Sequence, residues 1–580
     1  MTMTAQPFNG GRRHAYQPRG VIASLGLRKR LRLQDMHEHM LVTGAPGSGK
    51  TSCVVLPTVR KIVELGGAVV CFSTKGSDLR DYQRTIEQAS GRYIALGFDA
   101  PNARSEYVFD LFGHLTESGA TSTEIADVLV SAMNVVNQRT GASSANENDF
   151  FRDLARALLV HIITCLQSAG LSITAATITS IMNDARAKAG TSKHAKIARV
   201  LRRAEAARKA EQTSAHEARR IRAAIRFLDK EWPELADRTA SSVIGVWTGI
   251  SVDLEVGLAG LIDAPDEDQI AVSPATALED GVSLIIGPPT EASPRGGIIM
   301  QALWQACIRI GLQNRTPSDR TVVMVLDEFQ ASVSVHYLQM LLAMARSSRV
   351  GVLLATQSFA TVTARFGAEA AKSLFGLPAT VVSCRNDCPT TNTFSAERIG
   401  KHFIKVPSTS SSSSTPEFFS TGSGNRQSGI SWSEQERFIV SPATFRNLKG
   451  AGPRRARTDA IVQQRGYHCK AVWYRDRTQP HRAGATQRKL QIAAVIAIVG
   501  ITGISGLDVD NQPTSAKVAP TARRARRPIR RPATHYVRRG ETFGGIARRY
   551  RVSLKAMKEA NPLVAPDRIE VGALLRIPQP

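Results

Sequence analysis

A glycine-rich segment early in the chain has the residue types and spacing of a phosphate-binding loop. Residues 44–51 read Gly-Ala-Pro-Gly-Ser-Gly-Lys-Thr and fit the pattern G-x-x-x-x-G-K-[ST] without a mismatch. In such a loop the backbone N–H groups cradle a β-phosphate, the lysine reaches the β- and γ-phosphates, and the threonine hydroxyl holds Mg²⁺. An apolar run precedes the loop and a helical stretch follows it, which disfavours the alternative of a chance glycine loop. The predicted nucleotide site comprises Gly44, Ala45, Pro46, Gly47, Ser48, Gly49, Lys50 and Thr51, with ATP and Mg²⁺ as cofactors.

A second group of candidate residues follows two apolar runs farther along the chain. Residues 322–326 are apolar and lead into Asp327 and Glu328. At the tip of a strand, Asp327 would hold Mg²⁺ through water and Glu328 would polarise an attacking water. Gln357, after the next apolar run, could sense a γ-phosphate, and Arg346 could act across a subunit interface as an arginine finger. The alternatives are a strand that ends in solvated acids and, for Gln357 and Arg346 taken alone, ordinary surface positions.

The phosphate loop and the candidate residues after the apolar runs can meet only if the strands before them end at the same edge of one sheet. Short apolar runs at 39–43, 66–72, 282–286, 322–326 and 350–355 alternate with helical segments. This alternation predicts an α/β fold with a mostly parallel sheet covered on both faces. From about 115 to 277 the apolar positions have helical spacing instead, which predicts an inserted all-α domain. A Ser/Thr/Gly tract at 408–424 favours a flexible loop.

The chain carries a large excess of positive charge. It has 75 Lys and Arg residues against 49 Asp and Glu residues, a formal net charge of +26. Such an excess favours a polyanionic partner, either nucleic acid or an anionic envelope surface. The seven cysteines are scattered, which is typical of reduced thiols. A basic run, which forms either a solvated helix face or a sequence-independent contact to DNA phosphates, includes Arg199, Arg202, Arg203, Arg208, Lys209, Arg219, Arg220, Arg222 and Arg226.

Together these motifs resemble the VirD4/TraG family of type IV secretion coupling proteins. The resemblance rests on the phosphate loop, residues 73–78 and 149–155, Asp327-Glu-Phe329, Ala345-Arg346 and Thr356-Gln-Ser358, and it extends to about residue 475. It implies a RecA-like P-loop NTPase with an inserted all-α domain, assembled as a homo-hexamer whose ATP hydrolysis drives or licenses DNA transfer. The implied partners are single-stranded or relaxase-bound DNA and the components of a type IV secretion channel.

The chain departs from this family in two places. The family usually reads Asp-Pro-Lys-Gly-Glu after the second strand, whereas residues 73–77 here read Ser-Thr-Lys-Gly-Ser and lack both acids. The family's usual pair of N-terminal membrane helices is also missing. Neither departure touches the residues assigned to hydrolysis, so Lys50, Glu328, Arg346 and Gln357 keep their catalytic roles by position.

An uncharged apolar run from 490 to 507 follows the part of the chain that resembles this family. As a helix it would cover about 27 Å, which is close to the hydrocarbon thickness of a bilayer. Charged flanks favour a transmembrane helix over a buried core helix. More Lys and Arg residues lie just before the run than just after it, which favours an orientation with the preceding domain in the cytoplasm.

The last residues of the chain resemble a LysM domain, a small βααβ module. The resemblance rests on residues 536–543, 546–550, Leu554, Asn561-Pro562 and 569–578. It implies binding of N-acetylglucosamine-containing glycans, chiefly peptidoglycan, between two loops. By position, the glycan-binding residues are Gly540, Glu541, Thr542, Phe543, Asn561, Pro562 and Ile569. Together with the apolar run, this module predicts a single-pass protein of the bacterial inner membrane, with a cytoplasmic ATPase and a periplasmic LysM domain.

The sequence therefore predicts an ATPase that couples DNA to a secretion channel and is anchored by its C-terminus to membrane and peptidoglycan. One alternative is an FtsK/HerA-like DNA translocase unconnected with secretion, and another is a wall-bound scaffold with a vestigial ATPase. The expected parts are a basic tail (1–40), the ATPase domain in two pieces (41–114 and 278–475), the inserted all-α domain (115–277), the transmembrane helix (490–507), a linker (508–534) and the LysM domain (535–580).

Overall fold

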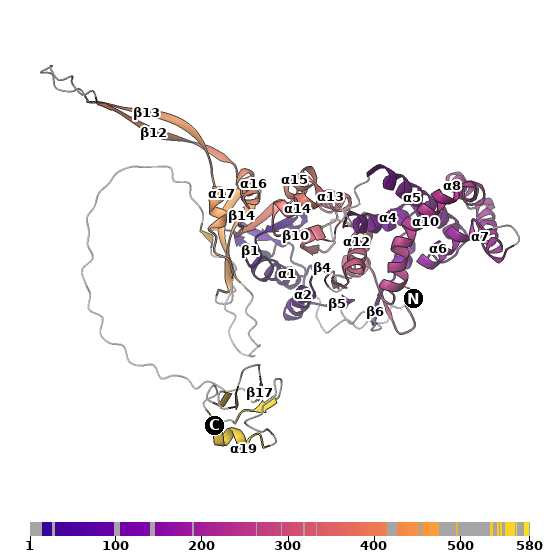
Figure 1. Ribbon diagram of the computed structural model, residues 1–580, viewed down its shortest axis with the longest axis horizontal. Helices are drawn as coiled ribbons and strands as arrows, with labels where there is room; N and C mark the ends of the chain where they lie inside the picture. The colour runs from indigo at the N-terminus through magenta and orange to yellow at the C-terminus, as the bar shows by residue number, and fades with distance from the viewer. Residues whose placement is uncertain are drawn as a thin grey trace. The chain divides into compact units, whose positions relative to one another are not determined.

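The computed structural model forms two compact units, residues 1–501 and 502–580 (Figure 1). In the first unit it describes residues 14–25, 29–97, 105–139, 145–187, 191–262, 264–289, 291, 293–316, 319–331, 333, 335–413, 426–451, 455–474 and 495–496. In the second unit it describes residues 534–537, 542–543, 546–547, 552–562, 564 and 574–578.

A 10-stranded sheet forms the centre of the first unit, with the strand order β16-β15-β14-β11-β3-β10-β9-β4-β8-β5. The strands are β3 (Met40–Thr43), β4 (Ala68–Phe72), β5 (Tyr93–Leu96), β8 (Ser283–Ile286), β9 (Val322–Asp327), β10 (Val350–Thr356), β11 (Thr380–Cys384), β14 (Arg457–Gln464), β15 (Tyr467–Tyr474) and β16 (Val495–Ile496). From β11 to β5 every neighbouring pair is parallel. This part confirms the predicted α/β class.

The strands beyond β11 in the sheet pair antiparallel, which the sequence did not predict. β14 pairs antiparallel with β11 and with β15, and β15 pairs antiparallel with β16. Arg465 and Gly466 form the turn between β14 and β15, both with positive φ (47° and 77°). Positive φ at both central residues is the geometry of a tight hairpin turn, so the chain reverses there instead of crossing over through a helix. The sheet is therefore mixed.

Helices cover both faces of the sheet because nearly every strand residue is apolar. Alternate side chains point to opposite faces: Val69 and Cys71 pack with α1 (Leu56–Glu64) and α2 (Gly76–Gln88), while Val70 and Phe72 belong to the core on the other side. That second core is covered by α12 (Pro294–Gly311), α13 (Val335–Met344), α14 (Phe359–Phe366) and α15 (Ala368–Gly376). A strand buried on both faces reads as a continuous apolar run, as these do.

A helical region lies between the short parallel strands β6 (Tyr107–Phe109) and β7 (Ile270–Val272). Its helices are α3 (Leu111–Glu117), α4 (Ser122–Arg139), α5 (Ala145–Ser168), α6 (Ala175–Asp184), α7 (Ser192–Lys209), α8 (Ala215–Arg226), α9 (Trp232–Glu234) and α10 (Asp237–Val252). Its apolar residues join the core that α12 builds against the sheet, and Phe109 stacks on Trp304 of α12. The helical region is thus packed onto the body of the sheet.

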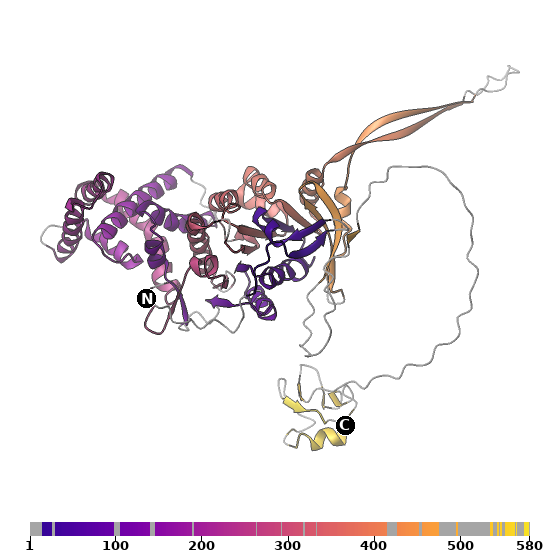
Figure 2. The ribbon, with the colours of Figure 1, turned by 180° about the vertical axis from the view of Figure 1, so that it is seen from behind.

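Two long strands project from the body as a hairpin, which is visible from both sides (Figures 1 and 2). β12 (Lys401–Ser413) and β13 (Arg426–Phe438) pair antiparallel in one register along their whole length. The prediction of a flexible loop at 408–424 is therefore wrong for residues 408–413, which lie in β12. The β-branched and aromatic residues before and after the serine tract favour strand, and pairing extends into the tract. Residues 414–425 lie outside the described part.

The remaining described elements are short. They are β1 (Val21–Leu25) and β2 (Lys29–Arg32), which form an antiparallel pair, with α11 (Pro274–Leu278), α16 (Pro389–Ile399), α17 (Pro442–Arg446), η1 (Leu33–Glu38), η2 (Lys50–Val55), η3 (Phe227–Glu231), η4 (Asp253–Gly257), η5 (Leu312–Asn314) and η6 (Phe329–Ala331).

The predicted membrane localisation is contradicted. Among the described residues, no helix combines the length and the apolar character needed to cross a bilayer. Within the run 490–507, only Val495 and Ile496 are described, and they form the short strand β16, paired with Lys470 and Ala471 of β15. The run was assigned to the membrane from its hydropathy and its charged flanks, and neither feature distinguishes a spanning helix from apolar residues in other structures.

The second unit has a small core of its own. β17 (Thr534–Tyr536) pairs antiparallel with β18 (Leu574–Arg576), and α19 (Leu554–Glu559) lies between them in the sequence. The buried side chains are Val537, Phe543, Ile546, Ala547, Met557, Leu575 and Ile577. Residues from both ends of the module thus pack together. The predicted linker lies outside the described residues, apart from Thr534.

Candidate nucleotide site

The glycine-rich loop lies between the end of β3 and the start of a helix. Lys50 begins η2, a π-helical segment that continues into α1, and Gly49 caps it with a φ of 93°. A helix N-terminus presents unpaired N–H groups and a positive dipole end, which together favour a phosphate. Short π-helical segments within helices are frequent at functional sites.

Close packing around the loop restricts two of its positions to glycine. A Cβ atom on Gly44 would lie 2.5 Å from Ser48 Oγ, and one on Gly49 would lie 2.8 Å from Ala451 Cβ. The hydroxyl of Thr458 in β14 donates to the carbonyl of Ser48 at 2.7 Å. The antiparallel extension of the sheet therefore helps to hold the loop. Ser48 Oγ is buried without a hydrogen-bond partner among the described residues, so it can still bond a ligand in the loop.

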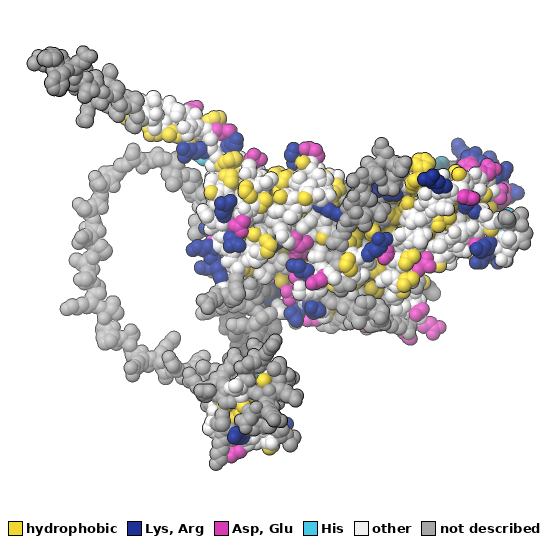
Figure 3. All heavy atoms as spheres, viewed as in Figure 1, with side chains coloured by type: hydrophobic (Ala, Val, Ile, Leu, Met, Phe, Trp, Pro, Cys, Tyr) yellow, Lys and Arg dark blue, Asp and Glu magenta, His cyan; other side chains and the backbone are white. Residues whose placement is uncertain are grey.

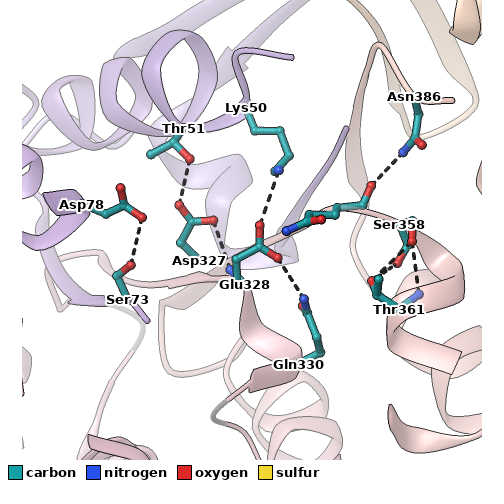
Figure 4. A network of polar contacts seen from close by, with 11 residues as sticks. Lys50, Thr51, Ser73, Asp78, Asp327, Glu328, Gln330, Ser358, Thr361 and Asn386 are labelled. Atoms are coloured by element: carbon teal, nitrogen blue, oxygen red, sulfur yellow. Dashed lines mark hydrogen bonds and ion pairs between the residues drawn. The ribbon is translucent and has the colours of Figure 1, made fainter. Parts of the chain in front are cut away.

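The tip of β9 brings the two predicted acids to this loop (Figure 4). Thr51 Oγ1 donates to Asp327 Oδ2 at 2.8 Å, and Lys50 Nζ lies 3.5 Å from Glu328 Oε1. The residues predicted to hold phosphate and metal thus meet, although more than 270 positions separate them in the sequence. The hydroxyl and the carboxylate provide the oxygen ligands that Mg²⁺ prefers. The side chains at this site therefore fit both a nucleotide phosphate and a Mg²⁺ ion.

Asp327 is buried, with 3% of its surface exposed. Burial raises the pKa of this carboxyl to about 6, and the hydrogen bond from Thr51 opposes that shift. The charges of Glu328 and Asp78 raise the pKa further, while Lys50 lowers it. The Asp327 carboxyl is therefore buried near two further carboxylates and near Lys50, an arrangement that a divalent cation would stabilise.

Glu328 has an unusual backbone conformation, with a φ of 52°. A non-glycine residue in the left-handed region costs on the order of 1 kcal/mol or more and persists only where its surroundings impose it. Here its backbone N–H donates to Asp327 Oδ1 at 3.0 Å, and Gln330 Nε2 donates to its Oε2 at 2.9 Å. These bonds aim the carboxylate at Lys50. The strain is consistent with a catalytic position.

Gln357 follows the last residue of β10, next to the loop strand β3 in the sheet. Its carbonyl accepts a hydrogen bond of 2.8 Å from Asn386 Nδ2. Asn386 is 3% exposed and follows β11, the other neighbour of β3. Sequence reasoning missed this asparagine. The only signal for it was a polar residue two positions after an apolar strand that ends at the same edge.

Arg346 lies away from the loop of its own chain. Its guanidinium is 72% exposed and lies 2.9 Å from Glu38 Oε1, and Glu38 precedes β3 whereas the phosphate loop follows it. Arg346 is thus at the opposite edge of the sheet from Lys50. The structure does not bring it together with the other predicted catalytic residues within one chain.

Most of the predicted glycan-binding residues of the second unit are buried or undescribed. Phe543 is 2% exposed in the core, and Asn561 is 6% exposed. The Asn561 side chain donates to the carbonyls of Met557 and Arg576 and accepts from the Arg576 N–H. The side chains of Phe543 and Asn561 therefore hold the module together and do not reach a ligand. Thr542 and Pro562 are exposed, while Gly540, Glu541 and Ile569 lie outside the described residues.

Two family models match the sequence. Residues 2–495 match the model described as type IV secretory system conjugative DNA transfer, and residues 535–578 match the LysM domain. No curated protein sequence matches the chain.

Solved structures with a similar fold include the plasmid coupling protein TrwB. TrwB in complex with a non-hydrolysable ATP analogue has a TM-score of 0.51 at 16% sequence identity, and the match covers 82% of this chain and 96% of that one. TrwB in complex with ADP and Mg²⁺ has a TM-score of 0.46 at 15% identity, with 82% and 92% covered. VirB4 of Thermoanaerobacter pseudethanolicus has a TM-score of 0.33 at 11% identity, with 59% and 76% covered. The likeness to the first of these shows a shared fold.

Proposed function

Because the chain belongs to the type IV secretory system conjugative DNA transfer family, we propose that it is the coupling ATPase that drives DNA into a secretion channel. Membership confirms the predicted resemblance and the predicted class of enzyme, a P-loop ATPase. The observation that carries the proposal is the meeting of Lys50 and Thr51 with Asp327 and Glu328 at one edge of the sheet. A vestigial ATPase would not need to keep this set intact.

The proposed site takes ATP with Mg²⁺, the ligand class seen in the TrwB complexes. The loop residues 44–51 cradle the phosphates, and Thr51 and Asp327 hold the metal, directly or through water. Bound Mg²⁺ supplies charge neutralisation at the β- and γ-phosphates. Glu328 orients the attacking water and takes its proton, while Lys50 leaves Glu328 for the phosphates. The side chain of Gln357, at the end of β10, senses the γ-phosphate.

Substitutions at these residues test the site. Steady-state ATP hydrolysis by the full chain should fall by about a hundredfold or more in Glu328→Gln, because the base is lost while the metal ligands remain. Lys50→Ala should lose turnover as well. Glu328→Gln should still bind a fluorescent ATP analogue, and Glu369→Gln, an exposed acid on α15, serves as the control. Unchanged hydrolysis by Lys50→Ala would refute the assignment.

The proposed DNA contact lies on α7 and α8, where Lys and Arg side chains gather (Figure 3). Arg208 binds Glu205, and Arg226 binds Glu231. Arg199, Arg202 and Arg203, in contrast, are exposed and pair with no acid in the described part of the chain. Exposed, unpaired arginines on one helix suit phosphate contacts that read no base sequence. The assembly proposed for DNA transfer is a homo-hexamer, and the nucleoprotein substrate is single-stranded or relaxase-bound.

The C-terminal module is proposed to bind peptidoglycan, since residues 535–578 match the LysM family. Of the residues predicted for this contact, Thr542 and Pro562 are described and lie exposed on the surface of the module. The module would tether the ATPase to the cell wall.

A further inference from the structure

An asparagine that the sequence did not single out connects two of the segments around the nucleotide site. Asn386 lies two residues after β11, and Gln357 directly follows β10. Because β3 lies between these two parallel strands, the residues leave the sheet on either side of the phosphate loop. Thr356 of β10 and Ser383 of β11 both lie opposite Thr43, the residue before the loop. A contact between Asn386 and Gln357 therefore spans the start of the phosphate loop.

The side-chain amide of Asn386 has a partner for each of its two polar atoms. Its Nδ2 donates to the carbonyl of Gln357 at 2.8 Å, and its Oδ1 accepts from the N–H of Cys388 at 3.0 Å. Figure 4 shows the first of these bonds. A carbonyl needs a donor and an N–H needs an acceptor, so only one orientation of the amide satisfies both partners.

Asn386 is itself held in place by the surrounding structure. It is buried, and its carbonyl accepts from the side-chain amide of Asn392 in α16 at 2.9 Å. Its N–H donates to the carbonyl of Phe445 in α17 at 3.4 Å. The carbonyl of the preceding residue, Arg385, accepts from the N–H of Ala45 in the phosphate loop at 2.9 Å. The segment of Asn386 is thus tied to the loop on one side and to the end of β10 on the other.

A local turn does not account for this arrangement. In an Asx turn the side-chain oxygen accepts from the N–H two residues on, as Asn386 Oδ1 does with Cys388, and an aspartate can make the same bond. Such a turn does not use the Nδ2 group. Here Asn386 is buried and Nδ2 donates to Gln357, a bond that an aspartate cannot make.

The residues that follow Gln357 are held by other bonds. Thr391 Oγ1 in α16 accepts from the N–H of Phe359 at 2.9 Å, and Ser358 Oγ accepts from the N–H of Thr361 at the start of α14. These bonds fix the beginning of α14, and the bond from Asn386 fixes Gln357 itself.

We propose that Asn386 is a positioning residue for Gln357. Its amide holds the backbone of Gln357 at a set place relative to the phosphate loop, so that the glutamine side chain meets the γ-phosphate. The inference rests on the proposed function, in which Gln357 senses that phosphate. Asn386 acts only through Gln357 in this role, and the phosphate loop and Lys50 keep their places without it.

Steady-state ATP hydrolysis by the full chain tests this role in Asn386→Ser. The serine hydroxyl can keep the turn to Cys388 but is too short to reach Gln357. The turnover number should fall by between about tenfold and a hundredfold, because misplacing a catalytic group by about 1 Å can lower a rate that far. The Kd for a fluorescent ADP analogue should not change, because ADP lacks the γ-phosphate. The matched control is Asp387→Asn, an exposed neighbour, which should change neither value.

A second variant and a double variant distinguish positioning from a general structural role. Asn386→Asp keeps the size of the side chain and should also lose turnover, because the donor to Gln357 is gone. Gln357→Ala keeps the carbonyl that Asn386 binds and removes the side chain that the bond orients. In Gln357→Ala the further change Asn386→Ser should therefore lower turnover by less than about twofold.

The possible results separate the inference from the function on which it rests. Unchanged turnover in both Asn386 variants would overturn the inference alone. Losses that multiply in the double variant, or ADP binding that weakens as much as turnover in Asn386→Ser, would also overturn it, since a purely structural role gives those results. If Gln357→Ala hydrolyses ATP like the wild type, the sensing role fails together with the inference. If Lys50→Ala does so as well, the proposed nucleotide site fails.

Discussion

At the scale of single residues, Lys50 and Glu328 hold each other in the site before any nucleotide arrives. Their charged atoms lie 3.5 Å apart, and both side chains are largely buried. Phosphates entering the loop would compete for the lysine and thereby free the glutamate to bind water. Gln330 keeps its bond to the other carboxylate oxygen, so Glu328 stays oriented when Lys50 leaves. Substrate binding and activation of the base are therefore linked through one ion pair.

Arg346 is the predicted catalytic residue that does not reach the nucleotide site of its own chain. Its ion pair with Glu38 is exposed on the arginine side and worth at most about 1 kcal/mol, so an interface could take it over. Arg346→Ala should bind nucleotide but hydrolyse it poorly. Mixing it with Glu328→Gln should restore part of the activity, because some interfaces then combine an intact arginine with an intact glutamate. Absence of rescue at every mixing ratio, measured by ATP turnover, would argue against a role across subunits.

The sequence identified the residues whose chemistry depends on local spacing and missed those that depend on tertiary contacts. The loop 44–51 could be found because a strand must precede it and a helix must follow it, and the pair Asp327 and Glu328 because it ends an apolar strand. Asn386 carried no comparable signal, because its role follows from which strands become neighbours. The left-handed φ of Glu328 was also unpredictable, since such strain is imposed by the surrounding fold.

At the scale of elements, the parallel half of the sheet was predictable and the rest was not. Buried runs such as 322–326 and 350–355 alternate with helices, and few folds other than a parallel sheet covered by helices have this pattern. The hairpin of β14 and β15 depends on the turn at Arg465 and Gly466, which is a weak sequence signal. β12 and β13 extend into serine-rich sequence that composition alone assigns to a loop. The apolar run at 490–507 has the hydropathy of a membrane-spanning helix. Nothing in the sequence indicated that two of its residues pair with β15.

The arginines of α7 allow a test of the DNA contact at the level of one helix. Arg203→Ala should weaken binding of the full chain to single-stranded DNA and reduce the slope of log K against log salt by about 0.7 if one phosphate contact is lost. Arg208→Ala is the matched control, because Arg208 is already engaged by Glu205 at 2.6 Å. The measurement is a salt titration of DNA affinity. Equal slopes for the wild type and for Arg199, Arg202 and Arg203 variants would assign α7 to an ordinary solvated surface.

At the scale of the whole molecule, one polypeptide combines a part that matches the conjugative DNA transfer family, residues 2–495, with a LysM module, residues 535–578. The full chain should therefore co-sediment with purified peptidoglycan, and a chain ending at residue 534 should remain in the supernatant. Lys50→Ala should sediment like the wild type, because the nucleotide site plays no part in this contact. Equal sedimentation of the truncated chain would show that the basic ATPase unit, and not the module, binds the wall polymer.

The proposed function requires that ATP hydrolysis at this one site is coupled to DNA. The most direct measurement is the steady-state rate of ATP hydrolysis by the full chain at increasing DNA concentration, for the wild type and for Lys50→Ala. We predict that the wild-type rate rises with DNA until it saturates, and that Lys50→Ala shows no turnover at any DNA concentration. A wild-type rate that does not respond to DNA, or hydrolysis by Lys50→Ala at the wild-type rate, would refute the proposed coupling.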